Sequence, residues 1–302
     1  MSIHKELHIL KTDDHGEFAL WEISKRNNSL IKKEAIFLSH GAFSDKTVCI
    51  GIADYLANHG YICFILEWRG HGTSPKTDIP FNFETVALYE YKTAFHYIHH
   101  HFNITSLHCV THSGGGLCLT MFLINYPEYL KNIQSITFVA CQAFGAVNNS
   151  FDFIKLFSAK LVVKGLGQIP VNKFKLGRIN ETYYTMRPWF NWNLKENFIS
   201  EFKYIDYKKF MSSIRVPIYS ICGTGDKFIA PAKGCYKYLQ AFENENNIFR
   251  EFGYSNNNLE NYSHSRIVLS QNAAKEVWPT ILQWIDKNSK AAFKPFILKL
   301  IF

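Results

Sequence analysis

The chain has 302 residues, of which 47% are hydrophobic and 19% are charged, so it can bury a large core and is not intrinsically disordered. The net charge is +8 at pH 7, but the longest basic clusters are pairs such as Lys32-Lys33 and Lys208-Lys209. Nucleic acid binding normally needs a basic stripe or patch, so we expect no nucleic acid partner. We interpret the excess charge as a solvated surface, with mild attraction to anionic substrates or membrane surfaces as the weaker alternative.

The opening segment, MSIHKELHILKTDDHGEF, is polar and lacks the apolar run of a secretory signal. No stretch of the sequence approaches the roughly 18 apolar residues that a membrane helix needs. The seven cysteines include no CxxC pair, and Cys63, Cys109, Cys141 and Cys222 lie in apolar runs. We therefore expect buried free thiols and a cytoplasmic protein.

The first elements in chain order are two segments of alternating polarity, at 6–11 and 17–25, which are typical of antiparallel edge strands. Continuous apolar runs then alternate with segments of helical pattern. Continuous runs are typical of parallel strands that are covered on both faces. The strand–helix alternation predicts an α/β fold with a doubly wound, mostly parallel sheet. The runs are 34–40, 61–68, 106–113 and 133–141, and the predicted helices are 46–59, 83–101 and 116–126.

The alternation of strands and helices is absent from residues 142–213, which are rich in aromatic residues. It resumes from residue 216. We predict one α/β core from 1–141 and 214–302, with 142–213 as an inserted cap. The later strands are expected at 216–222 and 247–252, and the later helices at 231–243 and 272–288. The tail FKPFILKLIF could contact a membrane or a partner, but packing onto the core is the favoured interpretation.

The motif Thr111-His112-Ser113-Gly114-Gly115 stands where an apolar run meets a helical run. A serine in a tight strand-to-helix turn is a nucleophile elbow, which needs small neighbours because its backbone is strained. The match is T-x-S-x-G, because Thr111 is larger than the usual glycine. The alternative is a glycine-rich turn that only caps a helix.

A second loop follows the run 34–38 directly and reads Ser39-His40-Gly41-Ala42-Phe43. In such a sheet it can aim a backbone N–H at the space above Ser113. We predict an oxyanion hole formed by the N–H groups of Ala42 and Gly114, where the helix dipole also favours negative charge. The Phe43 N–H is an alternative to that of Ala42, and the sequence does not separate the two.

The acid and the base are expected later in the chain, in the order Ser, Asp, His. Asp226 follows a predicted strand, and His264 lies 38 residues later, before the last helix. His264 would take the proton of Ser113, and Asp226 would orient and stabilise its ring. The alternatives are a helix N-cap for Asp226 and an ordinary loop residue for His264, since the chain has 13 histidines.

Taken together, H-G-A-F, E-W-R-G-H-G-T-S (67–74), T-H-S-G-G-G and G-T-G-D resemble the α/β-hydrolase superfamily. The chain is most similar to its serine aminopeptidase and monoacylglycerol lipase–lysophospholipase branch, although Glu67 stands where that branch usually has Asp. The resemblance implies that Arg69 and the glycines shape the loop beside the oxyanion hole. Haloalkane dehalogenases and epoxide hydrolases of this fold use an Asp nucleophile, and Ser113 argues against both.

Three other features have simpler interpretations. His96 and His100 have metal-ligand spacing, but they lack a carboxylate or cysteine partner nearby, so a solvated helix end is favoured. The three glycines 114–116 lack the Gly-Lys-Ser/Thr ending of a phosphate-binding loop. Arg187 and Trp189 could line a substrate pocket, but we favour a role in the cap's own small core.

These observations predict a serine hydrolase of carboxylic esters that needs no metal or organic cofactor, with a small acyl ester as its partner. Phe43, His112 and Trp189 are the candidate substrate-binding residues. An acyltransferase and an aminopeptidase or amidase are alternatives with the same triad, and a non-catalytic scaffold is the third. An aminopeptidase would need acidic residues to bind an amino terminus, which Glu181, Glu196, Glu201 and Asp206 leave open.

Overall fold

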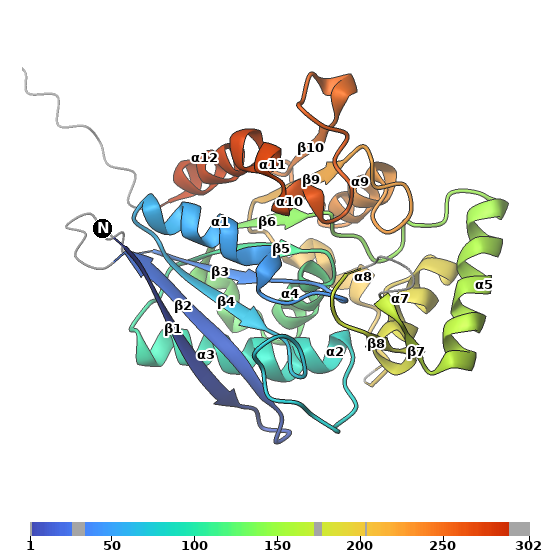
Figure 1. Ribbon diagram of the computed structural model, residues 1–302, viewed down its shortest axis with the longest axis horizontal. Coiled ribbons are helices and arrows are strands. Elements are labelled where there is room, and N and C mark those ends of the chain that lie inside the picture. The colour runs from blue at the N-terminus through green and yellow to red at the C-terminus, as the bar shows by residue number, and fades with distance from the viewer. Residues whose placement is uncertain (1, 26–33, 172–176, 203, 290–302) are drawn as a thin grey trace, which may run out of the picture.

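The computed structural model describes residues 2–25, 34–171, 177–202 and 204–289. Its centre is an eight-stranded sheet with the order β1-β2-β4-β3-β5-β6-β9-β10 (Figure 1). β1 pairs antiparallel with β2 and β2 with β4, and all the other pairs are parallel. The doubly wound, mostly parallel sheet predicted from the sequence is therefore confirmed. The strands are β1 (Ile3–Lys11), β2 (Glu17–Lys25), β3 (Ala35–Ser39), β4 (Ile62–Glu67), β5 (Leu107–His112), β6 (Ile133–Val139), β9 (Ile218–Gly223) and β10 (Ile248–Phe252).

The apolar runs are continuous because helices cover both faces of the sheet. On β3, Phe37 belongs to one core cluster, while Ile36 and Leu38 belong to the other. The helices α2 (Phe83–Thr85), α3 (Lys92–His101) and α4 (Gly114–Asn125) contribute to the first cluster. The second cluster includes residues of α1 (Thr47–Asn58), α10 (Arg266–Leu269), α11 (Gln271–Glu276) and α12 (Trp278–Asn288).

The single helix predicted over 83–101 contains a change of geometry. A π-helical segment, η1 (Val86–Tyr91), connects α2 to α3. The helix begins after Asn82, whose side chain accepts hydrogen bonds from two backbone N–H groups of the first turn. This geometry matters for the site because η1 carries Glu90, which is fully buried.

The described parts of residues 142–213, the segment predicted to form a cap and here named the cap segment, lie at one end of the sheet, at the right of Figure 1. The sequence pattern did not predict the helices of this segment. In α5, apolar residues face solvent as well as the interior, so the period of a one-sided amphipathic helix is lost. The described elements of the segment are α5 (Ser150–Leu166), β7 (Gln168–Ile169), β8 (Glu181–Thr182), α7 (Tyr183–Lys195), α8 (Tyr207–Phe210) and the short helix η3 (Met211–Ser213).

All seven cysteines lie in the described part of the chain, and each is a buried free thiol, as the sequence analysis predicts. None of the helices in the described ranges combines the length and the apolar character that crossing a lipid bilayer requires. The tail 293–302, for which we weighed core packing against membrane contact, lies outside the described residues.

Candidate active site

Ser113 occupies a sharp turn between β5 and α4. Its backbone has φ 53° and ψ −125°, a conformation that a residue with a side chain rarely adopts. The turn is held by the Ser113 N–H, which donates to the carbonyl oxygen of Val139 at 2.9 Å. This is the nucleophile elbow geometry, and it presents the Ser113 side chain to a cavity.

The backbone at the elbow passes so close to the loop after β3 that only glycine fits at the points of contact. A Cβ atom on Gly115 would lie 2.6 Å from the carbonyl oxygen of His40, and one on Gly41 would lie 2.7 Å from the Cβ of Ser113. Thr111, in contrast, is fully buried within β5 and pairs in register with Ser39. The first position of the motif therefore tolerates a threonine, because the tight contacts involve the glycines and not residue 111.

The structure brings Ser113, Asp226 and His264 together from three separate connections. Nε2 of His264 lies 2.8 Å from the Ser113 Oγ, and Nδ1 of His264 lies 2.5 Å from Oδ2 of Asp226. Asp226 follows β9, and His264 precedes α10. A hydroxyl, an imidazole and a carboxylate in this chain of hydrogen bonds form the arrangement that activates a serine as a nucleophile.

Asp226 is held in its ionised form. Burial by itself raises the pKa of this carboxyl group, but the His264 ring and the backbone N–H groups of Ala230 and Ile229 outweigh it and lower the pKa below its ordinary value. Those two N–H groups each donate at 3.1 Å, to Oδ2 and Oδ1. The carboxylate is thereby both charged and fixed in orientation.

His112 does not line the cavity, which corrects the prediction that it binds substrate. Its Nε2–H donates to the backbone carbonyl of His264 at 2.9 Å, so its ring contacts the main chain of His264. Burial and the neighbouring His264 lower the pKa of His112 to about 3. The ring is therefore neutral at neutral pH and supports the backbone of His264.

The two predicted oxyanion donors, Ala42 and Gly114, line the same cavity as Ser113. Gly114 is the first residue of α4, where the helix dipole favours negative charge. The alternative donor, the Phe43 N–H, already donates to Oε1 of Glu181 at 3.0 Å. We therefore retain Ala42 as the candidate donor and set Phe43 aside.

The cavity next to Ser113 has a volume of about 330 Å³ and an almost entirely apolar lining. Among the described lining residues, Gln142 is the one polar side chain besides Ser113 and His264. Its amide donates to the carbonyl oxygen of Ile229 and accepts from the N–H of Gly145. The apolar lining includes Phe43, Phe83, Leu117, Ala159, Val162, Val163, Ile169, Met186, Trp189, Phe190, Phe228 and Ile229.

Trp189 and Arg187, both on α7, have different surroundings in the structure. Trp189 lines the cavity and also belongs to the main hydrophobic cluster, so it is both a wall of the site and part of the core. Arg187 forms a two-pronged ion pair with Glu201 and is absent from the lining. The rings of His96 and His100 lie next to each other on α3, with centroids 4.2 Å apart and planes tilted by 44°. Within the described ranges, no group of three His, Cys, Asp or Glu side chains could hold a metal ion.

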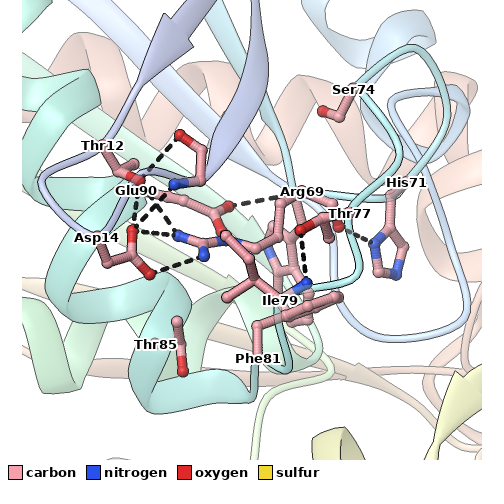
Figure 2. Close-up of polar contacts among 12 residues, drawn as sticks. Thr12, Asp14, Arg69, His71, Ser74, Thr77, Ile79, Phe81, Thr85 and Glu90 are labelled. Carbon is pink, nitrogen blue, oxygen red and sulfur yellow. Dashed lines mark hydrogen bonds and ion pairs between the residues drawn. The ribbon is translucent and has the colours of Figure 1, made fainter.

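The loop 67–74 beside the site is held by buried charges. Figure 2 shows the Arg69 guanidinium between Asp14, in the turn between β1 and β2, and Glu90 on η1. The nitrogen–oxygen distances are 2.7 Å to Asp14 and 2.6 Å to Glu90. Glu67 accepts from the N–H groups of Lys46 and Thr73, each at 3.0 Å. The sequence indicated a shaping role for Arg69, but not these carboxylate partners, which come from distant segments.

The eight-stranded sheet, the elbow after β5 and the chain order Ser, Asp, His define the class of α/β-hydrolase-fold proteins. The family model described as "alpha/beta hydrolase fold" matches residues 34–161. The chain therefore has the α/β-hydrolase fold, and the particular branch of that superfamily stays a prediction. No curated protein sequence is significantly similar to the chain.

Several solved structures share this architecture at low sequence identity. A thermophilic esterase from Thermogutta terrifontis is 12% identical with a TM-score of 0.59, and the match covers 94% of this chain and 100% of that one. Alpha/beta hydrolase domain-containing protein 10 from mouse is 14% identical with a TM-score of 0.63, over 94% and 100% of the two chains. A membrane phospholipase A described as a bacterial virulence factor is 17% identical with a TM-score of 0.61, over 94% and 87%.

Proposed function

We propose that the protein is a serine hydrolase that cleaves carboxylic (acyl) esters. The observation that carries the proposal is the hydrogen-bonded chain Ser113–His264–Asp226, which opens into an apolar cavity beside two candidate oxyanion donors. Structural neighbours that are named as esterases support this chemistry.

In the proposed mechanism, the Ser113 Oγ attacks the acyl carbon while Nε2 of His264 takes its proton. The negative oxygen of the tetrahedral intermediate accepts hydrogen bonds from the Ala42 and Gly114 N–H groups. The imidazolium of His264, stabilised by Asp226, then protonates the leaving alcohol. The resulting acyl-enzyme is hydrolysed by a water molecule that the same His264 activates.

The cavity lining supports an acyl chain as the group that binds beside Ser113. Burial of each methylene contributes about 0.8 kcal/mol, which corresponds to about fourfold in kcat/KM per methylene. Monoacylglycerols, lysophospholipids and simple carboxylic esters are the substrates that we propose on this basis. An acyltransferase would use the same residues, and product analysis with competing alcohols distinguishes the two activities.

The aminopeptidase alternative receives little support from the cap segment. Glu181 bonds to His71 and the Phe43 N–H, Glu201 pairs with Arg187, and Glu196 pairs with Lys237. Asp206 lies near Lys209, at 3.8 Å. None of these four carboxylates is among the described residues that line the cavity, so none is placed to bind a substrate's amino group there.

The test is labelling with a fluorophosphonate, followed by kinetics on p-nitrophenyl esters from acetate to dodecanoate. We expect the label on Ser113, and a kcat/KM that rises about fourfold per methylene until the cavity is filled. Trp189→Ala should weaken this chain-length dependence. Tyr184→Ala, which changes an aromatic residue of α7 that does not line the cavity, is the matched control. Turnover confined to aminoacyl amides, or an unlabelled serine in the folded protein, would contradict the proposal.

We further propose that the protein contacts an anionic lipid surface through α5. This helix stands at the outer edge of the molecule (Figure 1) and continues into the cavity wall through Ala159, Val162 and Val163. Lys155, Lys160 and Lys164 accompany its apolar residues, and their charge complements anionic lipid headgroups. A lipid surface at this position would deliver an acyl ester beside the cavity. The exposed large apolar side chains of α5 are Phe151, Phe153, Ile154, Phe157, Leu161, Val162 and Leu166.

Sedimentation with vesicles tests this contact. The protein is expected to bind vesicles that contain phosphatidylglycerol more strongly than vesicles of phosphatidylcholine alone. The double variant Phe151→Ser/Ile154→Ser should lose most of this binding, yet keep its activity on a short soluble ester, because neither residue lines the cavity. Tyr254→Ser, at another exposed aromatic residue, is the control. Vesicle binding that the double variant leaves unchanged would exclude α5 as the contact.

A further inference from the structure

The backbone of Phe43, next to the candidate oxyanion donor Ala42, is held on both sides by the cap segment. Its N–H donates to Oε1 of Glu181 at 3.0 Å, and its carbonyl oxygen accepts from the N–H of Arg178 at 2.8 Å. A Cβ atom on Gly177 would lie 2.1 Å from that same carbonyl oxygen, so only glycine permits this approach. Phe43 itself has φ 64°, a strained value for a residue with a side chain. These contacts oppose the relaxation of a strained loop.

Glu181 is in turn held by a buried histidine. Nε2 of His71 lies 2.9 Å from the carboxylate oxygen that binds Phe43, and both side chains are 2% exposed. Nδ1 of His71 lies 3.0 Å from the carbonyl oxygen of Arg69. Both ring nitrogens therefore face acceptors, and only the imidazolium donates to both at once. Burial lowers the pKa of His71, but the Glu181 carboxylate outweighs this effect and raises the pKa above its ordinary value.

His71 belongs to a loop that is anchored to the sheet by buried ion pairs. Arg69, two residues earlier, is fully buried between Asp14 and Glu90 (Figure 2). His71 also packs near the His40 ring, with centroids 5.4 Å apart, and His40 belongs to the same loop as Ala42. A continuous path of polar contacts thus leads from the sheet through Arg69 and His71 to Glu181 and the backbone of Phe43.

We propose that Glu181 is a positioning residue for the oxyanion hole. Its carboxylate, oriented by His71, fixes the peptide group that follows Ala42, so the Ala42 N–H is aimed at the site of the developing oxyanion before substrate binds. The proposal rests on the proposed function, because it assigns a role within that same site. It also makes the cap segment part of the catalytic geometry, beyond a role as a wall of the acyl cavity. Misplacement of such a donor by about 1 Å costs on the order of 100-fold in rate.

Three variants separate the possible roles of the carboxylate. Glu181→Gln keeps an acceptor oxygen for the Phe43 N–H but removes the charge. Glu181→Leu removes the acceptor and leaves the His71 cation buried without its partner. The pair Glu181→Leu/His71→Phe removes the acceptor together with that cation, and replacing a buried ion pair with apolar groups is often tolerated. Glu196→Gln, an exposed carboxylate of the same segment paired with Lys237, is the control.

The measurement is kcat and KM on p-nitrophenyl butyrate, with thermal unfolding to verify the fold. We expect the Leu variant and the double variant to lower kcat about 100-fold while KM changes less than about threefold, because a misplaced donor affects the transition state more than substrate binding. Glu181→Gln should retain kcat within about tenfold of the wild type, and Glu196→Gln should match the wild type. If Glu181→Leu does not fold, the double variant decides.

Two results would overturn the inference. One is an unchanged kcat in the folded double variant, and the other is a loss that lies in KM alone. A loss in Glu181→Gln as large as in the double variant would also contradict it, because charge and not the accepted hydrogen bond would then matter. Failure of the proposed function is recognised separately, since the wild-type protein would then neither hydrolyse the ester nor react with a fluorophosphonate.

Discussion

Replacement of Ser113 with alanine is expected to lower kcat on p-nitrophenyl butyrate by about 10⁴- to 10⁶-fold. The Oγ of Ser113 lies 2.8 Å from Nε2 of His264, and alanine removes this oxygen without adding any atom. The fold should survive, because alanine at φ 53° is no more strained than serine. Steady-state kinetics and fluorophosphonate labelling measure the effect, and the label should disappear with the activity.

Two further variants make this result specific. Ser265→Ala removes an exposed hydroxyl next to His264 and should leave kcat unchanged. The double variant Ser113→Ala/His264→Ala should be about as slow as either single variant, because nucleophile and base act as one unit. Full esterase activity in a correctly folded Ser113→Ala protein would mean that another group performs the attack.

Replacement of Asp226 with asparagine is expected to lower kcat by about 10³- to 10⁴-fold. Oδ2 of Asp226 lies near both Nδ1 of His264 and the N–H of Ala230. An amide NH₂ at that position would face two donors, and turning the amide around would meet the N–H of Ile229 instead. The variant therefore loses the charge that stabilises the imidazolium and disturbs the tautomer of the ring.

The stability of the same variant provides a second measurement. The pKa of Asp226 is lowered in the folded protein, so the unfolded chain takes up its proton first as the pH falls. The resulting stabilisation is present at neutral pH and is lost as the pH falls through the folded-state pKa, which lies below 3.8. Urea unfolding at pH 7 and pH 3 should show a weaker pH dependence in Asp226→Asn. Asp54→Asn, in a surface pair with Lys5, is the kinetic control. Wild-type kcat in Asp226→Asn would exclude Asp226 as the residue that orients His264.

Much of the fold could be predicted because a strand that is buried on both faces of the sheet has a continuous run of apolar residues. The strands β3, β4, β5 and β6 are continuous apolar runs, while β1 at the sheet edge alternates. The helix α5 has no comparable sequence pattern. Only Leu156 and Val163 are buried in it, and other apolar residues of the helix are exposed. Periodicity reports a helix only where one face is buried and the other is polar.

The candidate triad could be predicted from the sequence for a related reason. In a parallel sheet the carboxyl ends of the strands share one edge, so residues just after such strands meet even when they are far apart in the chain. Ser113 and Asp226 follow that rule after β5 and β9, and His264 comes from the longer connection between β10 and α10. The same reasoning does not extend to His112, for which adjacency to Ser113 suggested contact with substrate. Successive side chains at the end of a strand point in different directions. The His112 ring lies against the backbone of His264.

The sequence by itself determined the fold class and identified the candidate nucleophile, acid and base, since each depends on local pattern and chain order. Only the tertiary structure shows that the Phe43 N–H is already hydrogen-bonded, because its acceptor, Glu181, is 138 residues away in the chain. Likewise, no local pattern reveals that His71 is paired with that carboxylate. Contacts between distant segments depend on how the cap segment packs against the loops of the sheet, and packing depends on the shapes of many side chains at once.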